Sequence, residues 1–69
     1  MKDGWHTIRG WEVYMENNLV IRGIKTDSNG SRVTAYLYRR DQSGGWNKSE
    51  GMTAYALKAG LARGTIALM

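Results

Sequence analysis

The sequence predicts a small α+β domain, in which a three-stranded antiparallel sheet is followed by one C-terminal helix packed on one face. Three observations support this fold class. Apolar and polar residues alternate along three stretches between residues 11 and 40, as in strands with one buried face. Turn-forming residues separate these stretches. An alanine-rich stretch with helical spacing follows at residues 52–63.

Length and composition limit what the chain can be. At 69 residues it is expected to form one domain, residues 1–69, near the lower size limit for a single core. It contains no cysteine, so neither disulfides nor a cysteine zinc site can add stability. Ten Lys and Arg residues against six Asp and Glu residues give a formal net charge of +4. This charge favours an anionic partner, or serves solubility alone.

The first part of the chain predicts one strand and one tight turn. Residues 1–10 show no clear pattern, and Gly10 is interpreted as a bulge or a bend. Residues 11–16 alternate between apolar and polar side chains and form the first predicted strand. Asn17 and Asn18 follow it, and consecutive asparagines tolerate the positive φ angles of a type I′ hairpin turn.

The next part predicts a second hairpin. Residues 19–26 are rich in β-branched side chains and form the second predicted strand. Asn29 and Gly30 follow, and this pair between alternating segments predicts a two-residue turn. Residues 31–40 then form the third predicted strand.

Two-residue turns fix the register of this sheet. In that register Met15 faces Val20, Ile24 faces Ala35, and Arg22 lies on the core face. Either the Arg22 stem lies along apolar surface, or the register is wrong by one residue. The predicted core face holds Trp11, Val13, Met15, Val20, Ile24, Val33, Ala35 and Leu37. The predicted open face holds Glu12, Tyr14, Leu19, Ile21, Lys25, Thr34, Tyr36, Tyr38 and Arg40.

Residues 41–51 have turn chemistry throughout and predict a loop. Trp46 within it is either a lid over one end of the core or an exposed stacking or anchoring residue. At the C-terminus, residues 65–69 form an apolar tail. This tail is expected to return as a short fourth strand beside a sheet edge, or to fill a gap in the core with Ile66 and Leu68. Otherwise it is an exposed patch that awaits a partner.

The helix predicted over residues 52–63 has recognisable ends. Ser49 or Thr53 is the candidate N-cap, and Gly64 is placed to end the helix as its C′ residue. Leu57 and Leu61 lie on one face, four residues apart, and form an apolar stripe toward the sheet. The many alanines and glycines let such a helix lie close to a sheet.

No set of residues has the spacing of an active site. His6 is the only histidine, and the acidic residues show no paired spacing. The sequence also lacks a phosphate-binding glycine loop and a nucleophile elbow. We therefore predict a protein that is not an enzyme and uses no metal or cofactor. No stretch approaches the roughly 20 apolar residues that span a bilayer, so we expect a cytoplasmic protein with no membrane association.

The predicted binding surface lies on the open face of the sheet. Aromatic rings there can stack on bases while neighbouring cations hold phosphates, which favours nucleic acid as the partner. Tyrosines are also good strand formers that half-bury on open sheets, and Leu19 and Ile21 favour a protein partner or a homodimer instead. The candidate site residues are Tyr14, Lys25, Tyr36, Tyr38 and Arg40.

The two hairpins, the stretch Tyr36-Leu37-Tyr38-Arg39-Arg40 and the later helix carry an architectural resemblance. In these features the chain resembles the sheet-reading DNA-binding domains at the N-termini of some phage and transposon integrases. The resemblance implies that the sheet binds DNA. Those domains are parts of longer chains, whereas this chain begins with Met and is expected to be complete, so a recombinase role is not carried over.

Overall fold

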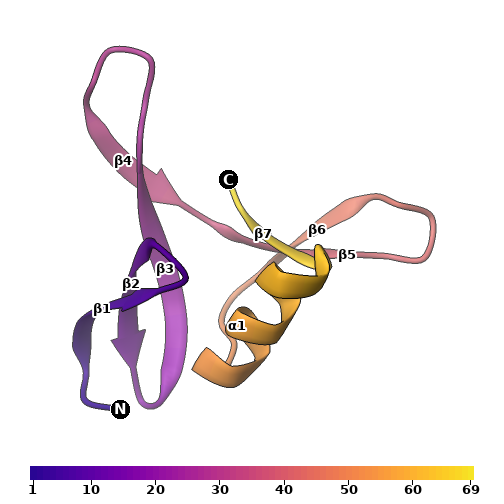
Figure 1. Ribbon diagram of the computed structural model, residues 1–69, viewed down its shortest axis with the longest axis horizontal. Helices are drawn as coiled ribbons and strands as arrows, with labels where there is room; N and C mark the ends of the chain where they lie inside the picture. The colour runs from indigo at the N-terminus through magenta and orange to yellow at the C-terminus, as the bar shows by residue number, and fades with distance from the viewer.

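A computed structural model describes residues 1–69 and confirms the α+β class. Seven strands form two antiparallel sheets, and one helix packs in the angle between them (Figure 1). The first sheet has the strand order β1-β2-β3-β4, and the second has the order β6-β5-β7. The elements are β1 (Gly4–Ile8), β2 (Trp11–Glu16), β3 (Leu19–Thr26), β4 (Arg32–Ala35), β5 (Leu37–Arg40), β6 (Trp46–Ser49), α1 (Ala54–Arg63) and β7 (Ile66–Leu68).

The first two turns are both tight and both need positive φ angles. Asn17 and Asn18 have φ angles of 51° and 64°, which confirms the type I′ turn between β2 and β3. Arg9 and Gly10 have φ angles of 46° and 84°, and they join β1 to β2 in the same way. The interpretation of Gly10 as a bulge or bend was therefore wrong, because a strand precedes it as well as follows it.

The second predicted hairpin turn is longer than two residues. β3 and β4 pair through Thr26 and Arg32, so five residues, 27–31, connect them. The Asp27 carbonyl accepts from the Gly30 N–H at 3.0 Å, and the Asp27 N–H donates to the Ser31 carbonyl at 2.8 Å. Residues 28–30 thus form a three-residue loop inside the Asp27–Ser31 pair. Gly30 has a φ of 81°, the left-handed position that closes such a loop with a bulge.

A bulge in β3 overturns the predicted register. Met15 faces Val20 as predicted, but Tyr14 faces Arg22, so β3 carries one extra residue between these pairs. Arg22 therefore points away from the core, and the alternative of a register wrong by one residue is correct. The longer turn at 27–31 shifts the pairing of β3 with β4 as well, so Gly23 faces Ala35, where Ile24 was predicted.

The predicted third strand and the predicted loop both have different structures. Residues 31–40 form two strands, because β4 belongs to the first sheet and β5 to the second. The stretch 41–51 contains β6, which pairs with β5 from Leu37–Ser49 to Arg40–Trp46. Trp46 is 36% exposed on this hairpin, so it is not a lid over the core. The exposed alternative agrees with the structure.

The helix begins and ends as the sequence indicated. The Thr53 hydroxyl accepts from the Ala56 N–H at 3.1 Å, and Gly64 has a φ of 79° at the C-terminal end. Gly60 is buried against Ile66, which confirms that small residues bring the helix close to a sheet. The tail forms β7, which pairs with β5, and Ile66 and Leu68 are also buried.

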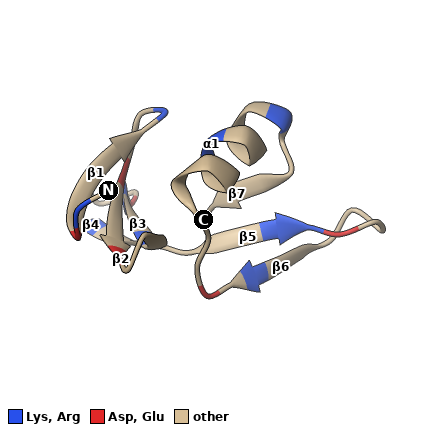
Figure 2. Ribbon diagram, turned by 90° about the horizontal axis from the view of Figure 1, so that it is seen from below, with Lys and Arg blue, Asp and Glu red and all other residues tan.

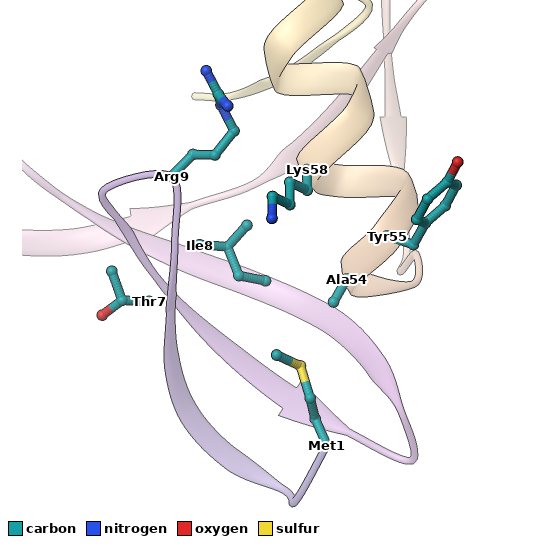
Figure 3. Close-up of a pocket in the computed structure, with 7 residues that line it drawn as sticks. All are labelled: Met1, Thr7, Ile8, Arg9, Ala54, Tyr55 and Lys58. Atoms are coloured by element: carbon teal, nitrogen blue, oxygen red, sulfur yellow. The ribbon is translucent and has the colours of Figure 1, made fainter.

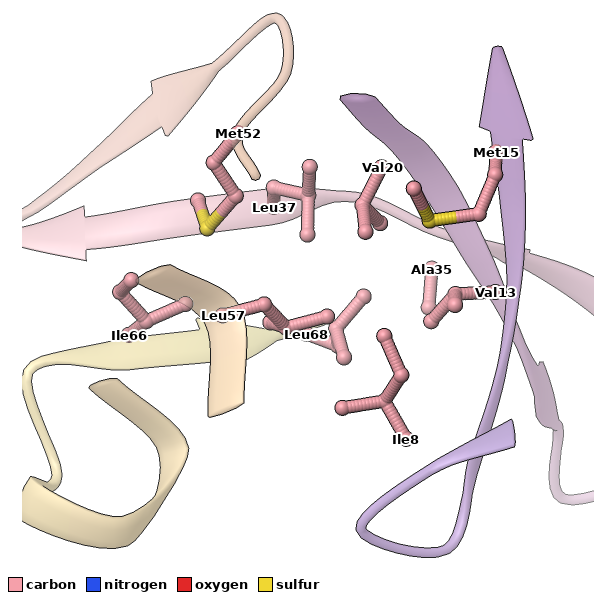
Figure 4. Packing of buried hydrophobic residues seen from close by; sticks show 10 residues of the cluster. All are labelled: Ile8, Val13, Met15, Val20, Ala35, Leu37, Met52, Leu57, Ile66 and Leu68. Atoms are coloured by element: carbon pink, nitrogen blue, oxygen red, sulfur yellow. The ribbon is translucent and has the colours of Figure 1, made fainter. Parts of the chain in front are cut away.

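The core lies where the two sheets and the helix meet (Figure 4). Three residues that were predicted on the core face, Trp11, Ile24 and Val33, are only half-buried. Ile24 pairs with Glu12 and Thr34, which places it on the outer face. The ten buried residues are Ile8, Val13, Met15, Val20, Ala35, Leu37, Met52, Leu57, Ile66 and Leu68.

Candidate aromatic and basic surface

The outer face of the second sheet carries a row of aromatic and basic side chains. Side chains alternate along β5, so Leu37 points to the core while its neighbours on either side point outward. Cross-strand partners share a face, and β6 adds the partners of Tyr38 and Arg40. We name this set the second-sheet row: Tyr36, Tyr38, Arg40, Trp46 and Lys48.

Each cation of the second-sheet row lies near an aromatic ring. The Lys48 Nζ is 3.9 Å from the centroid of the Tyr36 ring, and the Arg40 guanidinium carbon is 5.4 Å from the centroid of the Trp46 ring. Such cation–π contacts are worth about 0.5–1 kcal/mol at exposed sites. They orient the rings without burying them, since Tyr36 remains 44% exposed.

The turn between β5 and β6 is held by one carboxylate. Asp41 Oδ1 accepts from the Ser43 hydroxyl at 2.7 Å and from the Gly45 N–H at 2.8 Å, and Asp41 Oδ2 accepts from the Asn47 side chain at 2.9 Å. The hydrogen bond from the Ser43 hydroxyl, followed by those from Asn47 and Gly45, lowers the pKa of Asp41 to about 2. This acid is thus already occupied in fixing the hairpin that presents the second-sheet row.

Charge is distributed unevenly over the molecule (Figure 2). The strands of the second sheet contain Arg39, Arg40 and Lys48 and no acidic residue. The first sheet, in contrast, carries the one salt bridge, between Arg32 and Glu12. The strands of the second sheet are thus uniformly positive, and the acidic residues nearest to them, Asp41 and Glu50, lie just beyond the ends of β5 and β6.

A separate aromatic cluster lies on the outer face of the first sheet. The rings of Trp5 and Tyr14 meet edge to face with centroids 5.2 Å apart. The Arg22 guanidinium carbon lies 4.6 Å from the Tyr14 centroid and 5.7 Å from the Trp5 centroid. We name these three residues the first-sheet cluster. Its cation is half-buried between two rings, so this cluster is a packed unit.

The five candidate residues from the sequence do not form one surface. Tyr36, Tyr38 and Arg40 lie together in the second-sheet row. Tyr14 lies in the first-sheet cluster instead. Lys25 pairs with Val33, and the β3 bulge places it on the opposite face from the one predicted.

Sequence reasoning missed four aromatic or basic residues of these surfaces. Trp46 and Lys48 were missed as members of the row because residues 41–51 were interpreted as a loop. A signal was present, since Asp41-Gln-Ser-Gly repeats the Asp-x-x-Gly pattern of the 27–30 turn and therefore indicates a hairpin. Trp5 and Arg22 were missed because no strand was assigned to residues 1–10 and because the bulge reverses the face of Arg22.

Three further observations concern metal binding, membrane crossing and buried polar groups. No three His, Asp or Glu side chains gather into a group that could hold a metal ion. The single helix is too short and too polar to cross a bilayer. No buried side-chain nitrogen or oxygen lacks a hydrogen-bond partner.

Comparison with known proteins gives no family for this chain. Protein-family models, curated protein sequences and solved structures were compared with it, and none of them matches. The likeness to integrase DNA-binding domains that the sequence suggested finds no support in these comparisons.

Proposed function

We propose that this protein binds single-stranded nucleic acid through the second-sheet row. The observation that carries the proposal is the presence of three aromatic rings and two cations on one outward sheet face. Single-stranded nucleic acids bind where bases stack on aromatic side chains and cations follow the phosphates. The second-sheet row supplies both kinds of group within one short hairpin and its neighbouring strand segment.

The geometry of the rings suits successive bases. Tyr36 and Tyr38 lie two residues apart along the chain, a spacing of about 6.6 Å in a strand. The Lys48 ammonium lies over Tyr36 and is thus close to the phosphate of any nucleotide that stacks there. Arg40 is placed in the same way beside Trp46. Each cation would exchange an exposed ring contact for a charge-assisted contact with phosphate, which is the stronger interaction.

Single strands fit this surface better than duplexes. Bases in a duplex stack on one another and offer only their edges, whereas unpaired bases can be splayed out onto aromatic rings. Duplex readout from a β-ribbon depends on side chains that hydrogen-bond to base edges. The second-sheet row has three aromatic rings for stacking but only two cationic side chains that could read base edges.

A protein partner is a second candidate for part of this surface. Leu19 is 39% exposed, and its exposure supports the interface of Tyr14, Leu19, Ile21, Tyr36 and the apolar tail that the sequence suggested. Within the tail, Ile66 and Leu68 are not available, because both are buried. An apolar interface would respond little to salt, so the salt dependence of binding separates the two candidates.

The test is an NMR titration with mixed-sequence oligonucleotides, single-stranded and duplex, at two salt concentrations. If Arg40 and Lys48 each contact one phosphate, log K falls with log salt with a slope of about −1.4 for a single strand. Affinity then drops about sevenfold between 50 and 200 mM salt. Shifts are expected at residues 36, 38, 40, 46 and 48. No shifts at low salt would refute the proposal.

Matched variants locate the contacts. Tyr36→Ala is expected to weaken binding about fivefold or more, because one stacked base contributes about 1–3 kcal/mol. Lys48→Ala should weaken binding and reduce the salt slope by about 0.7. Lys25→Ala removes an exposed charge from the first sheet and should change little. Equal losses from Lys25→Ala and Lys48→Ala would show a diffuse charge effect and no defined site.

A further inference from the structure

A second surface lies between the helix and the β1–β2 turn, and it shares no residue with the second-sheet row. Two neighbouring hollows there, of about 250 and 350 Å³, are both lined by Arg9, Tyr55 and Lys58 (Figure 3). We name this region the helix groove. Its remaining lining residues are Met1, Thr7, Ile8, Ala54, Ala59 and Ala62.

The groove residues on α1 form a second face of the helix. Tyr55, Lys58, Ala59 and Ala62 are spaced by three, four and seven positions from the first of them, so they lie along one side. The core side of the same helix is formed by Leu57 and Gly60, both buried. The helix therefore presents one stripe of side chains to the core and a different stripe to the groove. The second stripe includes the small side chains of Ala59 and Ala62.

The polar groups at the rim of this groove have no partners within the chain. Arg9 and Lys58 are exposed, and the single salt bridge of the protein joins two other residues. Tyr55 is 81% exposed, the largest value among the large hydrophobic and aromatic side chains. Neither the groove lining nor α1 contains an acidic residue. The rim is thus positive and the floor is mostly apolar.

We propose that the helix groove docks an acidic amphipathic segment of a protein partner. Carboxylates of the segment would pair with Arg9 and Lys58, which flank the hollow from two different elements. Apolar side chains of the segment would lie over the alanines, whose small size leaves the hollow, and against the Tyr55 ring. Helix-in-groove recognition of this kind combines apolar anchors with a complementary charged rim.

The lining favours a protein segment over nucleic acid. A base needs an aromatic face for stacking, and the groove offers one ring, Tyr55, beside a floor of alanine and Ile8. Alkyl side chains pack well in such a hollow, whereas a base gains only the single ring. Because the groove and the second-sheet row have no residue in common, both ligands could be bound to one molecule at the same time.

The experiment uses the full chain, labelled for NMR, and three synthetic helical peptides. One peptide places Leu on one face and Glu on the other. The second replaces each Glu by Lys, and the third replaces each Leu by Ala. We expect only the Leu/Glu peptide to bind, with shifts centred on residues 9, 55, 58 and 62 and none along the second-sheet row.

Charge reversal provides the decisive comparison. The double variant Arg9→Glu with Lys58→Glu should lose about tenfold or more in affinity for the Leu/Glu peptide and gain affinity for the Leu/Lys peptide. Lys25→Glu changes an exposed charge outside the groove and should leave both affinities unchanged. Preserved dispersion of the amide signals shows that the variants remain folded.

Several outcomes would overturn the inference. They are the absence of shifts with the Leu/Glu peptide at low salt, equal binding of the Leu/Glu and Leu/Lys peptides, and oligonucleotide shifts centred on the groove. Groove signals that depend on protein concentration without peptide would also overturn it, since they would show that a second copy of the chain occupies the site. Loss of oligonucleotide binding by the row would leave this inference intact, because the two readouts map to different residues.

Discussion

The contact between α1 and β7 provides a sharp test of how the second sheet is held in place. Gly60 is buried on the helix and faces Ile66 of β7. A Cβ atom at position 60 would lie 2.8 Å from the Cβ of Ile66 and would also crowd its outer carbons. Because isoleucine is stiff at χ1 and its own Cβ is crowded, rotation of the side chain cannot relieve the contact. Gly60→Ala therefore has to displace backbone.

Two opposing effects set the size of the change in stability. Replacing a mid-helix glycine by alanine gains about 1 kcal/mol of helix propensity. Overpacking a core site costs about 1–3 kcal/mol, and this site lies toward the upper end because backbone has to move. We expect Gly60→Ala to lower the free energy of unfolding by about 1–2 kcal/mol. For a domain of this size each kcal/mol corresponds to about 4–8 °C in the midpoint of thermal unfolding.

A double-mutant cycle measures the crowding directly. Ile66→Ala alone should cost about 2–5 kcal/mol, as for other buried isoleucines. In the Gly60→Ala background the same truncation also removes the contacts with the outer carbons of Ile66, although the contact with its Cβ stays, so its cost should be smaller by about 1–2 kcal/mol. Unfolding by urea supplies the four free energies. Ala62→Gly, on the same helix but outside the core, measures the propensity effect alone. A stabilising Gly60→Ala together with additive free energies would refute the close-contact argument.

Two further perturbations test the turn and the first-sheet cluster. The pKa of Asp41 is about 2 when folded, below the ordinary aspartate value of 3.8, so its contribution to stability is complete above about pH 4 and is lost as pH falls through about 2. The difference in thermal midpoint between wild type and Asp41→Asn should therefore shrink from pH 5 to pH 2, and an Asp41 titration midpoint near 3.8 by NMR would contradict this. Arg22→Ala removes the cation shared by Trp5 and Tyr14 and should cost about 1–2 kcal/mol of stability, measured by urea unfolding. It should leave oligonucleotide affinity unchanged, and a loss comparable to that of Lys48→Ala would place the cluster in the binding surface.

Local signals in the sequence predicted much of the fold. Asn17-Asn18, Thr53 and Gly64 act on their immediate neighbours through φ angles and capping hydrogen bonds, so their roles can be read without knowledge of the tertiary structure. The helix and the β-strand character of the tail follow from patterns within a few residues. These elements were predicted with the correct type and with ends within two residues of those observed.

The errors arose where pairing between distant segments decides the outcome. The extra residue of the bulge is Ile21, and no residue near it in the sequence signals a bulge. The bulge lets Val20 and Gly23, which are three residues apart, both face the core. That single extra residue places Arg22 and Ile24 on the outer face and Lys25 on the opposite face, where it stays exposed, since a shift of one position exchanges the faces of a strand. The register therefore predicted Lys25 in a surface to which it does not belong.

The division of residues 31–40 between two sheets was invisible for a similar reason. Alternation continues without interruption from Val33 to Arg40, and it correctly predicted which side chains point outward. It carries no information about which strands pair on either side. The partners of β5 are β6 and β7, one of which was taken for a loop, so only three of the five residues of the second-sheet row could be predicted.

The two aromatic surfaces differ in how many rings each cation contacts, and this difference supports the proposal that the second-sheet row, and not the first-sheet cluster, binds nucleic acid. Arg22 is half-buried and lies over two rings, so withdrawing it would give up two ring contacts and uncover more of the half-buried Tyr14. Lys48 and Arg40 are exposed and each lies over one ring. A contact worth about 0.5–1 kcal/mol is readily exchanged for a phosphate, and the ring that the cation leaves is then open to a base. The second sheet can therefore change its contacts on binding at little cost, whereas the first-sheet cluster cannot.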